Sequence, residues 1–193
     1  MSNALIPTVQ VDQSGATARG DIVAGDKVET HIHSGVAPVG VVEKLLEKLH
    51  AEMAKSANTR HIIESLARYY EERSHDGVKG LKNKLDAAGR SAEYADAIEK
   101  KEMFAKLLEK WSLYSSAQEI FVHLLARAEH EFNLIIYPQL SNLEPFEVNQ
   151  LVTDKIVVPT VAECGSTVFN VNHGTAMGMI YWLAEQCFVR WHQ

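Results

Sequence analysis

Two histidine pairs are the groups in this sequence whose types and spacing come closest to a chemical site. His31 and His33 are separated by one residue, and residues 28–33 alternate apolar with polar side chains, as in a half-buried strand. A zinc ion held by these two imidazoles would need about two more ligands, and the neighbouring residues offer no cysteine or histidine at the usual spacing. We predict no metal ion, and a site completed by symmetry between subunits remains the alternative.

The second pair, His123 and His130, is seven residues apart and so lies on one face of a helix, with Glu119 one turn before His123. Di-iron helical bundles carry Glu-x-x-His on two helices. Here Val122 follows Glu119 at the third position, where that motif has histidine. We therefore expect these histidines to be exposed or hydrogen-bonded side chains and not ligands.

Other signatures of catalysis or cofactor binding are missing from the sequence. It contains no P-loop, no dinucleotide-binding glycine fingerprint, no Gly-x-Ser-x-Gly and no His-Glu-x-x-His. Ser166 and Thr167 have no recognisable base, and Cys164 and Cys187 have no Cys-x-x-Cys partner. We predict no cofactor, no catalytic residue and reduced, buried thiols. The alternative is an enzyme whose composite site forms at contacts between subunits.

The charge of the chain argues against a general nucleic-acid binder. Its 193 residues carry 19 basic and 25 acidic side chains, for a net charge of −6, whereas nucleic-acid affinity comes mostly from neutralising phosphates. The basic-leaning stretch 68–90 holds six basic side chains offset by four acidic ones. A small nucleic-acid-binding regulator that uses this stretch is a further alternative.

The two ends of the sequence lack targeting and membrane-spanning signals. The N-terminus has no basic region followed by a long apolar run. The longest uncharged stretch, 164–184, is interrupted by polar residues and three glycines and is not a membrane span. We therefore expect a cytoplasmic protein that does not contact a membrane.

Residues 1–38 differ in character from the rest of the chain and form a Gly/Asp-repeat segment. Glycines recur every five residues, and Gly20-Asp21-Ile22-Val23 is nearly repeated by Gly25-Asp26-Lys27-Val28. Short strands with tight turns fit this pattern, but so short a β segment cannot bury a face alone. We predict that copies from several subunits pair, giving a homo-oligomer, and a free tail is the alternative. The predicted oligomerisation residues are Gly15, Gly20, Asp21, Ile22, Val23, Gly25, Asp26, Val28 and Ile32.

Residues 39–193 are predicted to form a mostly α-helical, bundle-like domain. Apolar residues at helical spacing indicate helices over about 40–55, 59–70, 79–87, 91–111, 115–137, 145–158 and 175–190. Pro138 is expected to end the most apolar helix, and Pro159 to break the next one. Residues 167–171 read as one short strand.

The last 56 residues are poor in charge, with Lys155 and Arg190 against five acidic side chains. This composition fits either a large share of the core or an interface with another chain. The sequence from Gly178 to Trp191 combines small residues with aromatic ones that join an apolar body to a polar group. The residues predicted to bind a partner are Gly178, Met179, Tyr181, Trp182, Leu183, Cys187, Arg190 and Trp191; the alternative is that they close the core of the domain itself.

This ending consists of Gly-Met-Ile-Tyr-Trp-Leu at 178–183, then Cys187, then Val-Arg-Trp at 189–191. It resembles the closing motif of the C-terminal domain of the ABC three-component systems, to which Lamassu-type bacterial defence operons are related. The Gly-Asp units at 20–28 also resemble the segment that often precedes effectors in such systems. The resemblance implies a partner that is an ABC- or SMC-like ATPase, a nuclease effector, or both. Members often carry an effector domain ahead of this domain, and 193 residues leave no room for one.

Together these observations predict a non-enzymatic, oligomerising adaptor or regulatory subunit of a bacterial complex that defends against phages or plasmids. The helical domain would bridge the ATPase and an effector. The Gly/Asp-repeat segment would bring several copies together.

Overall fold

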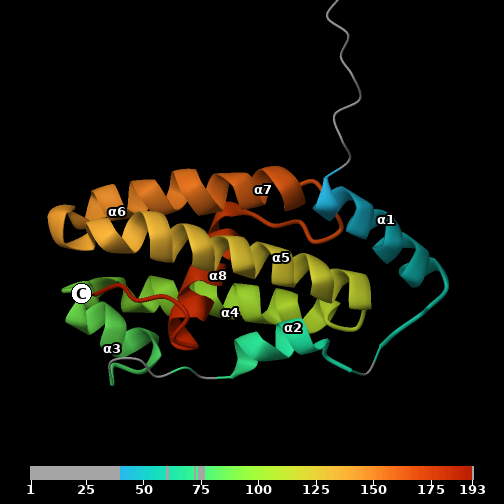
Figure 1. Ribbon diagram of the computed structural model, residues 1–193, viewed down its shortest axis with the longest axis horizontal. Coiled ribbons are helices and arrows are strands. Elements are labelled where there is room, and N and C mark those ends of the chain that lie inside the picture. The colour runs from blue at the N-terminus through green and yellow to red at the C-terminus, as the bar shows by residue number, and fades with distance from the viewer. Residues whose placement is uncertain (1–39, 60, 72, 74–76, 193) are drawn as a thin grey trace, which may run out of the picture. The chain divides into compact units, whose positions relative to one another are not determined.

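The computed structural model describes residues 40–59, 61–71, 73 and 77–192 (Figure 1). Helices dominate, and none of the described residues lies in a strand. In the labels, α marks α-helices, η1, η2 and η4 are 3₁₀-helices, and η3 and η5 are π-helices. The elements, in chain order, are α1 (Val41–Ala54), α2 (Glu64–Ala67), η1 (Arg68–Tyr70), α3 (Gly80–Ala87), η2 (Ser91–Glu93), α4 (Tyr94–Trp111), α5 (Ser115–Glu131), η3 (Phe132–Ile136), η4 (Tyr137–Asn142), α6 (Pro145–Val152), η5 (Thr153–Val157), α7 (Val158–Cys164) and α8 (His173–Glu185). The predicted mostly helical, bundle-like fold is confirmed.

The Gly/Asp-repeat segment lies outside the described residues. The same holds for His31, His33 and every predicted oligomerisation residue. The predictions made for this segment therefore remain predictions.

Helix α1 packs on α5 because its apolar stripe is spaced as a helix requires. Val42, Leu45 and Leu49 are buried on this face. At the other end of α1, Glu52 accepts hydrogen bonds from the hydroxyls of Ser115 (2.9 Å) and Ser116 (2.7 Å). A carboxylate at a helix N-terminus is favoured by the helix dipole, so Glu52 joins the end of α1 to the start of α5.

The segment before α2 is held by a buried side chain of α5. Gln118 is fully buried; its amide oxygen accepts from the backbone N–H of Ile63 (2.7 Å), and its amide nitrogen donates to the carbonyls of His61 (3.0 Å) and Ser112 (2.7 Å). Helical structure there is limited to residues 64–70. It is shorter than the predicted helix over 59–70 because the backbone at 61–63 is bonded to Gln118 and not to a preceding turn.

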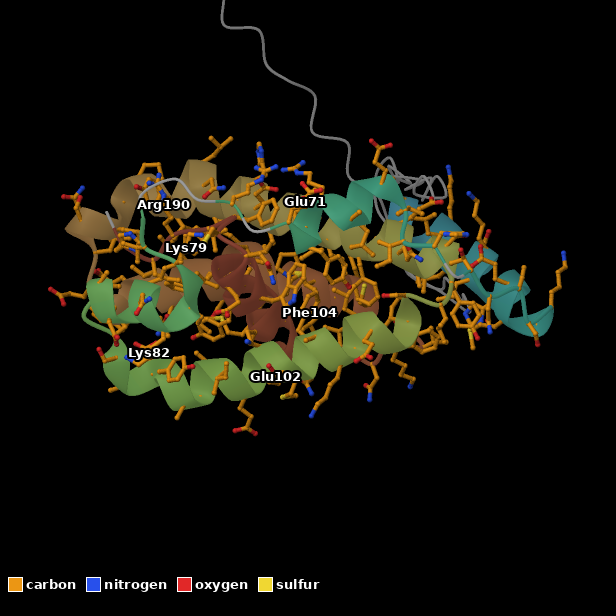
Figure 2. All side chains as sticks on the ribbon, turned by 90° about the horizontal axis from the view of Figure 1, so that it is seen from below. Glu71, Lys79, Lys82, Glu102, Phe104 and Arg190 are labelled. Atoms are coloured by element: carbon orange, nitrogen blue, oxygen red, sulfur yellow. The ribbon has the colours of Figure 1, made fainter. Side chains whose placement is uncertain are left out.

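Among the described residues, helices α4 and α8 share the most extensive contact of any two elements. Helix α4 turns Ala97, Phe104 and Leu108 inward. Figure 2 shows Phe104 on the side of α4 that faces α8 and Glu102 on its outer side. The ring of Phe104 meets that of Trp182 on α8 at 5.8 Å in an edge arrangement, which is the favoured geometry for aromatic pairs.

Two prolines do not end their helices, so both predictions about them are wrong. The helical run from α5 continues through η3 into η4, which contains Pro138, and α6 continues through η5 into α7, which contains Pro159. Figure 1 shows the second run lying alongside α5. Each proline stands two residues after a π-helical segment. A π-turn bonds each N–H to the carbonyl five residues earlier and widens the helix, which gives the proline ring the room that an α-helix lacks.

The predicted strand over 167–171 is also wrong. These residues form turns, with Asn170 in the left-handed region (φ 50°). The apolar pattern instead reflects burial, because the ring of Phe169 packs between those of Trp111 and Phe121, with ring centroids 5.2 Å and 5.4 Å away. Among the described residues there is no strand with which 167–171 could pair. Asn172 then caps α8 by accepting from the backbone N–H of Thr175 (2.9 Å).

Candidate partner-binding site

All eight residues predicted to bind a partner lie on α8 and on the segment that follows it. Seven of them are buried, and only Arg190 is partly exposed. Gly178, Met179, Tyr181, Trp182 and Leu183 pack within the domain. The structure therefore places these residues in the core, as the alternative reading of the sequence allowed, and partner contact through them remains a proposal.

At Gly178, helix α8 lies very close to the backbone of α4. A Cβ atom at this position would lie 2.0 Å from the carbonyl oxygen of Lys100 and 2.6 Å from its carbonyl carbon. Both atoms belong to the backbone of α4, so neither can turn aside as a side chain could. The glycine is required by helix packing.

The end of α8 is bound to α3 by two reciprocal contacts. Lys84 is 1% exposed, and its ammonium donates to the backbone carbonyls of Ala184 and Val189, the latter at 3.3 Å. Glu185 in turn accepts from the backbone N–H of Leu81 (2.6 Å) in the first turn of α3. A cation at a helix C-terminus and a carboxylate at an N-terminus both complement the helix dipole. We call this arrangement the α3–α8 clasp.

Cys187 forms the turn that ends α8. Its φ is 63°, in the left-handed region. The N–H of Cys187 bonds to the carbonyl of Ala184 (3.1 Å), and the N–H of Phe188 to that of Leu183 (2.9 Å). This is the pattern of a Schellman motif, in which glycine usually occupies the left-handed position.

Trp191 closes the other side of the core. Its ring lies 5.1 Å from that of Phe132 and 5.7 Å from that of Tyr181, and the Arg90 guanidinium lies over it at 4.5 Å. Burial raises the pKa of Tyr181 to about 12. The aromatic ending therefore packs against η3, α8 and the residue that precedes η2.

Residues of the motif line several depressions on the surface. Trp182 lines the first, which we call the Trp182 groove; its volume is about 350 Å³, and its other lining residues are Ile62, Tyr70, Ala105, Leu108, Glu109 and Ser112. Ile62 is 47% exposed and Tyr70 is 43% exposed. The Tyr70 ring meets the edge of Trp182 at 5.6 Å. The groove is therefore mostly apolar, with Glu109 as its charged group.

Cys187 and Arg190 line the second depression, of about 330 Å³. Arg190 lies over the ring of Tyr137 (4.5 Å), and Arg73 lies over the ring of Phe188 (4.4 Å). Glu129 lies in the same depression and accepts from Arg68 (2.9 Å) and from the phenol of Tyr69 (3.0 Å). Burial, together with the Glu129 carboxylate, raises the pKa of Tyr69 to about 12. The third depression, of about 440 Å³, runs along α8 and includes Tyr181.

The basic stretch 68–90 does not form one positively charged surface. Lys84 and Arg90 are buried, and Lys82 pairs with Asp86 at 2.6 Å. Arg68 pairs with Glu129 on α5. Four of the six basic side chains of this stretch are therefore buried or paired within the described part of the domain.

The remaining sequence candidates lie apart from one another. His123 lines a depression near the start of α1 together with Glu163, while His130 is exposed. Cys164 is buried, and burial raises its pKa to about 11. In the part of the chain that the structure describes, no group of three or more His, Cys, Asp or Glu side chains is placed to hold a metal ion.

Sequence reasoning missed the α3–α8 clasp. The signal for Lys84 was present, because it falls in the apolar stripe of α3 between Leu81 and Leu85. A lysine in such a position either extends to solvent or finds carbonyl partners. Glu185 gave no comparable signal, since its partner is a backbone N–H 104 residues away in the sequence.

A comparison with protein-family models matches residues 80–191 to C-terminal domain 9 of the ABC-three component (ABC-3C) systems. The chain belongs to this family. The match begins at α3 and ends at Trp191, so the α3–α8 clasp joins the two ends of the CTD9 domain. The resemblance stated from the closing motif is thereby confirmed and extends over more than half of the chain.

Comparisons with curated proteins and with solved structures gave no significant match. Among the described residues, no helix combines the length and the apolar character needed to cross a bilayer. The CTD9 match thus carries the assignment to the ABC-3C defence systems.

Proposed function

We propose that this CTD9 protein is a non-enzymatic adaptor or regulatory subunit of a bacterial defence complex, acting in the cytoplasm. Its partners would be an ABC- or SMC-like ATPase, a nuclease effector, or both, which it would bridge. The observation that carries this proposal is the family match over residues 80–191. It is supported by a domain whose motif residues are mostly buried in the core and line depressions on the surface.

The partner surface that we propose is the Trp182 groove. Ile62 and Tyr70 are large apolar or aromatic side chains that stay substantially exposed beside it, a feature typical of interaction sites. Glu109 on its rim makes no ion pair within the described part of the chain. A partner segment with an apolar face and one basic side chain would complement both properties.

In this proposal the buried motif residues act indirectly. Gly178 lets α8 lie close to α4, and Trp182 forms the wall of the groove. Arg190, the most exposed of the eight predicted residues, would offer a second contact from the neighbouring depression. The motif would thus set the shape of the partner surface more than supply its contacts.

The test is binding of co-expressed partner proteins by the full-length chain carrying Ile62→Ser and Tyr70→Ser. Both side chains are exposed, so the variant is expected to fold as the wild type does. Loss of these contacts should weaken the complex at least about tenfold, as for hot-spot residues. Leu134→Ser is the matched control, since Leu134 is 61% exposed and lies outside the groove. Equal binding by both variants would remove the groove from the proposal.

We further propose that residues 1–38 assemble several copies of the chain. Pairing copies raises the effective concentration of whatever each CTD9 domain holds. Ile22→Asp with Val28→Asp in the full chain would place charges on the predicted apolar face and should lower the mass measured by light scattering. Circular dichroism should show unchanged helix content. An unchanged mass would contradict this part of the proposal.

A further inference from the structure

The floor of the Trp182 groove is one face of α4. Ala105, Leu108 and Glu109 lie on this helix and line the groove at positions i, i+3 and i+4. Ser112, which directly follows the last residue of α4, continues the row at i+7. From Ala105 to Ser112 the helix rises about 10 Å, at about 1.5 Å per residue. The groove therefore follows α4 for about two turns.

The side chains beside this floor favour an apolar occupant. Trp182 is 5% exposed and so forms a wall, whereas Ile62 and Tyr70 keep almost half of their surface exposed. Ala105 is the smallest side chain of the floor, and a small residue lets a neighbouring element approach a helix closely. Apolar side chains of a partner would therefore gain contact on three sides.

The groove offers few hydrogen bonds to a peptide backbone. The Ser112 hydroxyl already donates to the carbonyl of Leu108, which leaves the Tyr70 phenol and the Trp182 indole N–H as side-chain donors. An extended segment about 10 Å long has about three residues, and the described residues contain no strand whose edge could pair with it. Backbone groups that lose water without a new partner weaken binding. An α-helix avoids this cost because it bonds its own backbone groups.

Glu109 supplies the charge of the groove. Its carboxylate makes no ion pair within the described residues. Lys110, the next residue, places its ammonium over the ring of Trp111 (5.1 Å). Burial raises the pKa of the Tyr70 phenol, and the Glu109 carboxylate adds to that rise, so its charge is felt inside the groove. A basic side chain of a partner would complement it.

We propose that the Trp182 groove binds an amphipathic α-helix of a partner protein, which carries a lysine or arginine opposite Glu109. Its apolar anchors would stand at i, at i+3 or i+4, and at i+7, because this spacing matches the two turns of α4 that form the floor. The inference rests on the proposed adaptor function and adds the kind of segment that the partner presents.

The first experiment is photo-cross-linking in the complex of the full-length chain with the co-expressed proteins encoded beside it. Lys106, an exposed residue of α4 next to Ala105, is replaced by p-benzoylphenylalanine. The cross-linked partner segment should show the apolar spacing given above and a lysine or arginine. A complex whose cross-link maps to a proline-rich segment, or to a second copy of this chain, would overturn the helix inference and leave the adaptor role standing. Absence of any complex would remove both.

A synthetic peptide of the cross-linked segment then tests the helix and the charge. Its circular dichroism should gain helical signal when it binds the full chain, and a proline at its centre should weaken binding at least about tenfold. Glu109→Lys should weaken binding about tenfold, and glutamate in place of the basic residue of the peptide should recover most of that loss.

Glu102→Lys is the matched control for the charge reversal. Glu102 lies on the outer side of α4 (Figure 2) and outside the groove, so its replacement should leave binding of the peptide unchanged. Binding without a gain of helix, or equal effects of Glu109→Lys and Glu102→Lys, would overturn the proposal.

Discussion

Replacing Gly178 by alanine should destabilise the domain, although alanine is the better helix former. The new Cβ would lie 2.0 Å from the Lys100 carbonyl oxygen, so α8 would have to move about 1.4 Å to reach an ordinary contact of about 3.4 Å. Overpacking of a core costs about 1–3 kcal/mol, and the upper end applies because the obstacle is backbone. The gain in helix propensity is up to about 1 kcal/mol, which leaves a net loss of about 2 kcal/mol.

This loss can be measured as a change in Tm by circular dichroism at the helical band. For a domain of this size about 1 kcal/mol shifts Tm by about 2–4 °C, so Gly178→Ala should lower Tm by about 4–8 °C. Gly40→Ala is the matched control, because no atom lies within 4 Å of a Cβ at Gly40 and its φ is −62°. A Gly178→Ala protein that is as stable as the wild type would refute the packing argument.

Three further predictions concern the end of α8 and the buried phenols. Lys84→Met should cost about 2–3 kcal/mol in urea unfolding, because two buried carbonyls lose their donor; a loss below that of an exposed lysine substitution would contradict the clasp. Cys187→Val should lower stability by about 1–2 kcal/mol because a β-branched residue is strained at φ 63°, whereas Cys187→Gly should be tolerated better; the reverse order would be inconsistent with the turn. The pKa values of Tyr69 and Tyr181 are raised from 10.0 to about 12 in the folded state, so their protonated forms stabilise the fold below pH 10. This stability should fall as pH rises from 10 to 12, and Tyr181→Phe should make the fall shallower in thermal unfolding at alkaline pH; an identical pH dependence would be evidence against a buried phenol.

The helical fold was predictable because most of its information is local. The apolar stripe of α1 and the strongly apolar α5 are set by spacing alone. The exceptions have causes that the spacing of apolar residues does not reveal. Pro138 and Pro159 are tolerated by π-turns, and the residues before α2 are held by Gln118 from another helix. Phe169 is apolar because it fills the core between two aromatic rings, and not because it belongs to a strand.

For the candidate site, the sequence indicated the right segment of the chain but not which of its side chains are exposed. The closing motif identified the family correctly, but its large side chains could equally have faced a partner or the core, and burial of Met179 and Trp191 depends on helices far away in the sequence. The exposed side chains of the Trp182 groove, Ile62 and Tyr70, lie outside the family match. Motif reasoning therefore could not have found them.

The most direct test of the adaptor role is native mass spectrometry of the tagged, full-length protein after co-expression with the proteins encoded beside it. We predict a stoichiometric complex that contains an ABC-type ATPase or a nuclease together with more than one copy of this chain, and its loss when Ile62 and Tyr70 are both replaced by serine. Recovery of this chain alone, while the ATPase and the nuclease are present in the same lysate, would contradict the adaptor role.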